Sequence, residues 1–90
     1  MKRVIVTVVG KDTVGIIARL CTYMAEHNVN ILDISQTILQ GIFTMTMLVD
    51  LAAASAPFLE IKERLDALAD ELGVQITMQR EEVFKYMYRL

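Results

Sequence analysis

The chain has 90 residues and a net charge of −2, with 54% hydrophobic and 22% charged residues. A chain of this length forms one domain and buries only somewhat more than about 60% of its unfolded surface. The apolar content is high for so small an interior, which predicts that a partner covers part of the surface. Because the chain lacks both a basic run and a stretch of about 20 apolar residues, we expect it to bind neither nucleic acid nor a membrane.

The amino-terminal residues and the cysteine content both favour a cytoplasmic location. The single cysteine, Cys21, cannot form an internal disulfide, as is typical of proteins in a reducing compartment. Met1, Lys2 and Arg3 lead into a strand-like segment and do not resemble the start of a signal peptide. We therefore expect a cytoplasmic protein.

A strand and a helix are the first predicted elements. Residues 4–9 are almost all β-branched, which favours a strand, and residues 10–15 then break it with two glycines and an aspartate. Beyond this break the apolar residues recur at helical spacing, at Ile17, Leu20, Cys21 and Met24. We expect Asp12 or Thr13 to cap the start of this helix, and His27 with Asn28 to close its end.

The rest of the chain predicts a hairpin, a second helix and a fourth strand. Residues 29–40 and 42–51 are extended stretches on either side of Gly41, which suits a hairpin turn. The odd-numbered residues of the second stretch are wholly apolar and should face the core. After a loop over residues 52–57, an amphipathic helix over residues 58–72 ends at Gly73, and residues 74–79 alternate as a strand.

The resulting order, βαββαβ, predicts an α+β fold of the ferredoxin-like type. It places two helices on one face of a four-stranded antiparallel sheet. The domain should span residues 3–79, followed by a short helical tail over residues 80–90 that packs on the domain or on a partner. On the uncovered face the alternation places Ile5, Val9, Ile42 and Leu48. A second copy of the chain would bury them, so we expect a homodimer.

The chain offers few groups for catalysis or metal binding. Cys21 lies on the apolar stripe of the first helix, and His27 lies at its end, so a structural role is expected for both. One cysteine and one histidine do not supply the about four ligands of a structural zinc site. Met24, Met45, Met47 and Met78 fall at predicted core positions. We therefore expect no catalytic residue, no metal and no cofactor.

One segment, residues 10–15 between the first strand and the first helix, is suited to a small ligand. The unpaired N–H groups at a helix start can hold a carboxylate, and the Asp12 side chain could meet an ammonium group. Asn30 and Asp33, at the start of the second strand, are expected to lie near this loop. The residues alone leave a second interpretation open, in which the glycines shape a tight turn, Asp12 caps the helix and Asn30 ends a loop.

Two short motifs carry a family resemblance. These are Asp12-Thr13-Val14-Gly15-Ile16 at the first strand–helix junction and Asn30-Ile31-Leu32-Asp33-Ile34 at the second strand. With the element order, over residues 3–79, they resemble the ACT domain family. The chain is similar to stand-alone bacterial ACT proteins and to the amino-terminal half of the glycine-cleavage-system repressor type.

The resemblance implies a non-catalytic regulatory domain that binds an amino acid or a similar small ligand at a subunit interface. By position, it implies ligand contacts from Asp12, Thr13, Val14, Gly15, Asn30 and Ile31. ACT domains are usually attached to an enzyme. We expect this one to stand alone, so its signal should pass to a partner protein that the sequence does not identify.

Three other functions compete with the sensor. The first is a ligand-independent dimeric protein-interaction module. The second is an enzyme of the acylphosphatase kind, which needs an arginine in the first loop where this chain has only Lys11. The third, a dimeric monooxygenase of similar fold, has little support from the lone His27.

Overall fold

The structure, a computed structural model, describes residues 2–11 and 15–87. In chain order the elements are β1 (Arg3–Lys11), α1 (Ile16–Glu26), β2 (Asn30–Leu39), β3 (Ile42–Asp50), α2 (Phe58–Leu72), β4 (Gln75–Arg80) and α3 (Glu81–Met87). The expected βαββαβ order is therefore confirmed, and a short helix follows the fourth strand.

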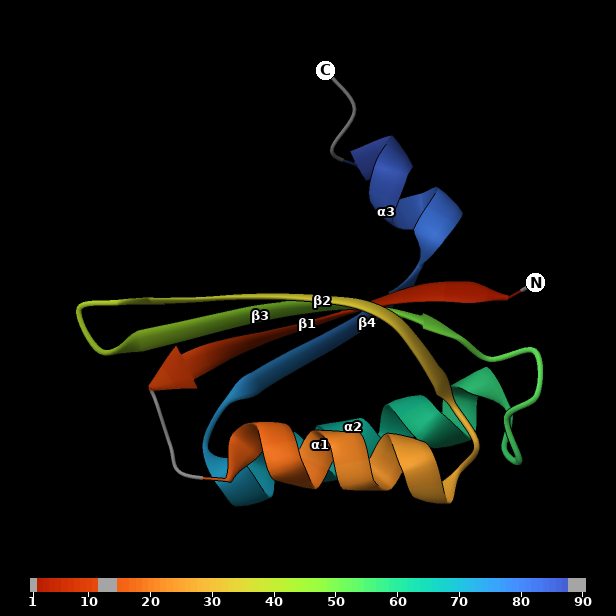
Figure 1. Cartoon of the computed structure of the whole chain (residues 1–90), viewed down its shortest axis with the longest axis horizontal. Coiled ribbons are helices and arrows are strands. Elements are labelled where there is room, and N and C mark those ends of the chain that lie inside the picture. The colour runs from red at the N-terminus through yellow and green to blue at the C-terminus, as the bar shows by residue number, and fades with distance from the viewer. Residues whose placement is uncertain (1, 12–14, 88–90) are drawn as a thin grey trace.

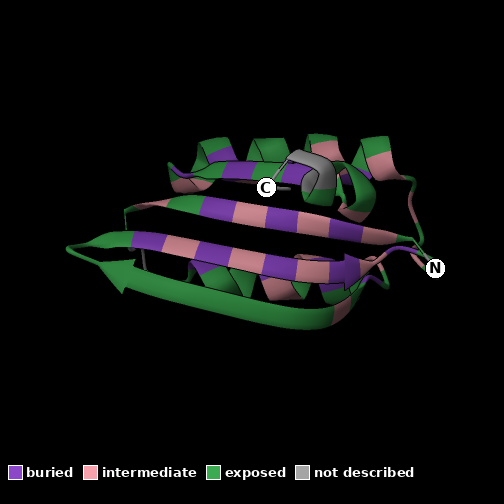
Figure 2. Cartoon of the chain, turned by 90° about the horizontal axis from the view of Figure 1, so that it is seen from above, coloured by how far each residue is buried: buried purple, intermediate pink, exposed green. Residues whose placement is uncertain are grey.

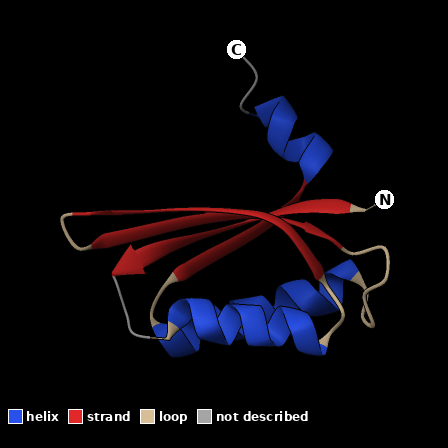
Figure 3. Ribbon diagram, viewed as in Figure 1, coloured by secondary structure: helices blue, strands red, loops and turns tan. Residues whose placement is uncertain are grey.

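The four strands form one antiparallel sheet in the order β2-β3-β1-β4. Helices α1 and α2 lie side by side against one face, whereas α3 projects on the other side of the sheet (Figures 1 and 3). The turn between β2 and β3 has positive φ at both Gln40 (50°) and Gly41 (82°). Two such residues are typical of a type I′ hairpin turn, whose twist matches that of the strands.

The core lies between the sheet and the two helices. As predicted, the odd-numbered residues of β3 face it, from Phe43 through Met45 and Met47 to Val49, all at most 3% exposed. Met24 and Met78 are buried in the same cluster, so the methionines fill the core as expected. Strand β1 contributes Val4, Val6 and Val8, and α2 contributes Ile61, Leu65 and Ala69.

The buried stripe of α1 agrees with the prediction at Leu20 and Met24 and differs from it at the first turn. Ile16, Leu20 and Met24 are buried, at a spacing of four residues, while Ile17 is exposed and Cys21 is half-buried. The helix begins directly after Gly15, which occupies the N-cap position, where Asp12 or Thr13 was expected. The helix therefore starts later than predicted, with Ile16 facing the sheet and Ile17 facing outward.

The end of α1 agrees with the prediction that His27 closes the helix. His27 is the C-cap residue, and its Nδ1 donates a hydrogen bond of 3.1 Å to the carbonyl oxygen of Tyr23. The two rings stack with their centroids 4.2 Å apart. Burial raises the pKa of Tyr23 above its usual value, and the nearby Arg64 opposes this shift. The histidine is thus held by a structural contact.

The sheet face opposite α1 and α2 is open, as predicted. In the view of Figure 2, β1 and β3 alternate between buried and partly buried residues, while β2 is exposed along nearly its whole length. Ile5 and Leu48 pair across β1 and β3 and are half-buried, and Val9 and Ile42 are exposed. Of the described elements only the short α3, which contacts β1 and β4, lies on this side of the sheet, so most of the apolar surface remains open.

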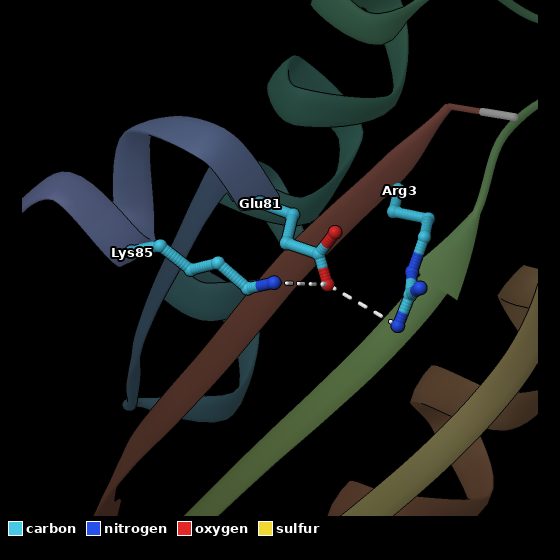
Figure 4. A network of polar contacts seen from close by, with 3 residues as sticks. All are labelled: Arg3, Glu81 and Lys85. Atoms are coloured by element: carbon cyan, nitrogen blue, oxygen red, sulfur yellow. Dashed lines mark ion pairs between the residues drawn. The ribbon is translucent and has the colours of Figure 1, made fainter.

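Helix α3 is tied to β1 by an ion-pair network (Figure 4). Glu81 Oε2 lies 3.2 Å from Arg3 Nη2 and 3.9 Å from Lys85 Nζ. Because these side chains are partly solvent-exposed, such pairs contribute at most about 1 kcal/mol each. The network orients the start of α3 without fixing the whole helix.

Candidate functional site

Glycines on either side of the β1–α1 junction allow close packing and an unusual backbone conformation there. Gly10 of β1 packs against Val74, and a Cβ on Gly10 would lie 2.6 Å from Val74 Cγ1. On the far side of the junction, Gly15 has a φ of 91° and a ψ of 0°, which glycine adopts without steric cost. Of the six predicted ligand contacts, Asp12, Thr13 and Val14 lie outside the described residues.

The first turn of α1 has backbone N–H groups with no hydrogen-bond partner inside the helix. Its first intrahelical bond runs from the N–H of Arg19 to the carbonyl oxygen of Gly15, at 2.9 Å. The N–H groups of the residues between them have no helical partner. The first turn contains no acidic residue, and the N-cap glycine makes no side-chain hydrogen bond. The helix therefore offers a partial positive charge that suits a carboxylate.

Asn30 and Ile31 lie far from this junction within one chain. Asn30 pairs with Asp50, which pairs with Arg3, so Asn30 is level with the beginning of β1. The junction follows the other end of β1, where Gly10 pairs with Phe43 and Phe43 pairs with Ile38. The expectation that Asn30 and Asp33 lie near the first loop is therefore wrong for a single chain, because β1 and β2 run in the same direction.

The side chains at the start of β2 have local roles. Ile31 is half-buried, packs against the core and pairs with Val49. Asn30 is exposed and lines a shallow cavity of about 390 Å³ with Asn28 and Ala53. The Asp33 carboxylate accepts a hydrogen bond from the N–H of Ile34 at 2.9 Å. A neighbouring chain can reach these residues, whereas the β1–α1 junction of their own chain cannot.

Strand β2 forms one edge of the sheet and exposes large apolar side chains that the sequence analysis did not single out. They are Leu32, Ile34, Ile38 and Leu39, the last of them 70% exposed. A β-bulge lies between Ile31 and Asp33. The apolar residues of β2 do not alternate with polar ones at a period of two. This pattern in the sequence indicates that both faces of the strand carry apolar side chains. A long apolar edge strand is a site for pairing with another chain.

The described residues contain no group of three or more histidine, cysteine, aspartate or glutamate side chains placed to hold a metal ion. In the same part of the chain, no helix combines the length and the apolarity needed to cross a membrane.

Comparisons with known proteins identify the family. The model of the ACT domain family matches residues 2–79. A UPF0237 protein from Bifidobacterium longum is 56% identical over 90 residues, with all of both chains covered. An ACT domain protein from Streptococcus pneumoniae has a TM-score of 0.80 and 38% identity, covering 97% of this chain and 98% of that one.

A structure described as a putative glycine cleavage system transcriptional repressor shares the fold. Its TM-score is 0.75 at 22% identity, and the match covers 88% of this chain and 45% of the other. The resemblance inferred from the two motifs is thus confirmed, as is the expectation of a regulatory, non-catalytic domain. The chain belongs to the ACT domain family.

Proposed function

We propose that the chain works as a homodimer that binds an amino acid or a similar small ligand between its subunits and signals to a partner protein. Residues 3–79 would form the ligand-binding domain and residues 80–90 a tail that contributes to pairing or to signalling. One observation carries the proposal: Gly15 lies at one end of the sheet, and Asn30 and Ile31 lie at the other. These residues could therefore contact one ligand only if they came from two different subunits.

Pairing of two β2 edges removes that separation. In an antiparallel pair related by a two-fold axis, the start of one β2 lies beside the end of the other. The end of β2, where Leu39 pairs with Ile42 and Ile42 with Lys11, is level with the β1–α1 junction. Asn30 and Ile31 of one subunit would therefore approach the junction of the second subunit.

The β2 edge is better suited to this pairing than the β4 edge. Strand β2 has ten residues and four large exposed apolar side chains. Strand β4 has six residues, and its two large apolar side chains, Ile76 and Met78, are already buried in the core. Helix α1 also contacts β2, the strand at the proposed interface.

The ligand chemistry follows from the groups at this interface. The free N–H groups of α1 would receive the ligand carboxylate. Asp12, whose carboxylate would meet the ammonium group, and the backbone from Thr13 to Gly15 would come from one subunit. The Asn30 amide and the side chain of Ile31 would come from the other. No step of bond making is involved, and ligand binding acts only by favouring one pairing geometry over another.

A thermal-unfolding screen against the twenty amino acids tests the proposal. Ligand at a hundred times its dissociation constant adds about 2.7 kcal/mol, which raises the melting temperature of so small a domain by about 10–20 °C. The increase should disappear in Asp12→Ala and in Asn30→Ala. Asp66→Ala is the matched control, because Asp66 is an exposed carboxylate on α2 that pairs only with Lys62 in the described part of the chain.

The competing interaction module gives a different result. If no amino acid stabilises the protein and the dimer persists, the chain is a ligand-independent dimeric module, and the exposed β2 edge then serves assembly alone. If stabilisation survives in both Asp12→Ala and Asn30→Ala, the ligand binds elsewhere and the proposed site is wrong.

A further inference from the structure

A second cavity, of about 610 Å³, opens beside β4 at the end of the sheet where β1 begins. Arg80 pairs with Val4 there, so the cavity lies at the other end of β1 from the β1–α1 junction. Its lining extends from Arg80 of β4 to Leu51 just after β3, and it does not include Asn30 of β2. Its lining includes Lys2, Arg3, Leu51, Phe58, Leu59 and Arg80.

The backbone of Lys2 and the side chain of Arg80 are held in place at this cavity. The N–H of Lys2 donates to Asp50 Oδ1 at 3.1 Å, and the carbonyl oxygen of Lys2 accepts from Leu51 at 2.8 Å. The guanidinium carbon of Arg80 lies 5.2 Å from the centroid of the Phe58 ring. Stacking occupies the face of a guanidinium group and leaves the N–H donors at its edge available.

Neither cation has an acidic partner within 4.0 Å in the described part of the chain. By contrast, the third cation of the lining, Arg3, is paired with Glu81. The chain as a whole carries a net charge of −2, so the uncompensated positive charge at Lys2 and Arg80 is a local feature. Its position at a cavity indicates an anionic ligand.

The remaining lining is apolar. Leu51 is buried and forms part of the core, Phe58 is half-buried, and Leu59 is 69% exposed. A cavity volume between about 300 and 1,000 Å³ is typical of small-molecule sites, which combine apolar walls with a few placed polar groups. The cavity therefore has space for the apolar part of a ligand and two hydrogen-bond donors for a negatively charged group on it.

We propose that this cavity binds a small carboxylate that carries an apolar or aromatic body. The edge of the Arg80 guanidinium and the Lys2 ammonium group would receive the carboxylate, as charge-assisted donors. Phe58, Leu59 and Leu51 would contact the apolar body. This site is separate from the proposed interface site, and it requires only one chain. Since Arg80 directly precedes α3, a ligand bound to Arg80 would also contact the connection to that helix.

The test is an NMR titration of the full chain at constant ionic strength with three probes. Phenylacetate has both the charge and the ring, 2-phenylethanol has the ring without the charge, and acetate has the charge without the ring. We expect saturable shifts of the backbone amides of Lys2, Leu51, Leu59 and Arg80 with phenylacetate. The two partial probes should bind at least about tenfold more weakly.

Three variants and a control locate the binding groups. Lys2→Met and Arg80→Met keep an apolar stem and remove the charge, and each should weaken phenylacetate binding about three- to tenfold. Leu59→Ser should weaken it as well, and its exposure means that the fold does not depend on it. Lys62→Met, which removes an exposed lysine outside the cavity lining, should leave binding unchanged.

Several results would overturn the proposal. One is the absence of saturable shifts at these amides, and another is binding of 2-phenylethanol or acetate as tight as that of phenylacetate. Equal affinity of the wild type and Arg80→Met, with the fold intact, would exclude the assigned cation. Amide shifts centred on Gly15 and Asn30 would instead assign phenylacetate to the interface site. The titration therefore distinguishes binding at the two proposed sites.

Discussion

Gly10 in β1 and Val74 just before β4 approach so closely that no side chain fits on Gly10. A Cβ there would lie 2.6 Å from Val74 Cγ1 and 3.2 Å from Val74 Cα. Because the second contact is with backbone, movement of the Val74 side chain cannot relieve all of the overlap. This packing holds the end of β1 against β4 immediately before the candidate ligand loop.

Gly10→Ala should therefore destabilise the domain by about 1–3 kcal/mol through overpacking. Urea denaturation of Gly10→Ala, Val74→Ala and the double variant measures the coupling between the two positions. The double variant should recover part of the loss, because Val74→Ala removes Cγ1 while Cα remains. Strictly additive free energies of unfolding would contradict the close contact.

Two leucines of α2 give a matched comparison of buried and exposed positions. Leu65 is 1% exposed and lies in the core, whereas Leu59 is 69% exposed on the same helix. Leu65→Ala should lower the free energy of unfolding by about 2–5 kcal/mol, since it leaves a cavity. Leu59→Ala should change it by about 0.5 kcal/mol or less. Similar losses for both variants would mean that α2 is packed with a different face toward the sheet.

The proposed dimer places Ile34, near the middle of the exposed β2 edge, close to the two-fold axis. In Ile34→Lys, two like charges would therefore meet, and we expect the dimer dissociation constant to rise about tenfold or more. Analytical ultracentrifugation over a concentration series measures this change. Leu59→Lys, an equally large change at an exposed site on α2, is the control and should keep the wild-type association. A dimer unaffected by Ile34→Lys would have to form through another surface, such as the open sheet face.

Stability at acid pH should depend on Asp50. Its carboxylate accepts hydrogen bonds from the N–H groups of Ala52 and Lys2, and the first of these is the main reason that its pKa lies below the usual value. Because the folded state has the lower pKa, the stabilising contribution is present above the unfolded value of about 4. It is lost as the pH falls from there through the folded value.

Thermal unfolding of the wild type and Asp50→Asn between pH 3 and pH 6 tests this dependence. The wild type should be the more stable protein at pH 6, and the difference between the two melting temperatures should shrink as the pH falls below about 4. Glu63→Gln, which neutralises an exposed carboxylate of α2, provides the reference for the general effect of charge. A constant difference over the whole range would show that Asp50 does not titrate with a lowered pKa.

The sequence was sufficient to predict the elements and the fold because their signals are local. Alternation along β3 identified its buried face, and Gly41 and Gly73 lie where the hairpin and the end of α2 require positive φ. In the first turn of α1 the buried residue is Ile16 and not the predicted Ile17, because the start of a helix depends on the conformation at Gly15 and on how the loop enters it. Residue spacing alone does not set that starting point.

What the sequence by itself determined is the set of candidate residues, the family and the excess of apolar surface. Only the tertiary structure decided which of those residues lie together, since that depends on strand register and strand order. Asn30 and Gly15 are separated because β1 and β2 run in the same direction on either side of β3. Lys2, Phe58 and Arg80 are distant in sequence and meet at one cavity because the start of β1, the end of β4 and the start of α2 lie at the same end of the sheet.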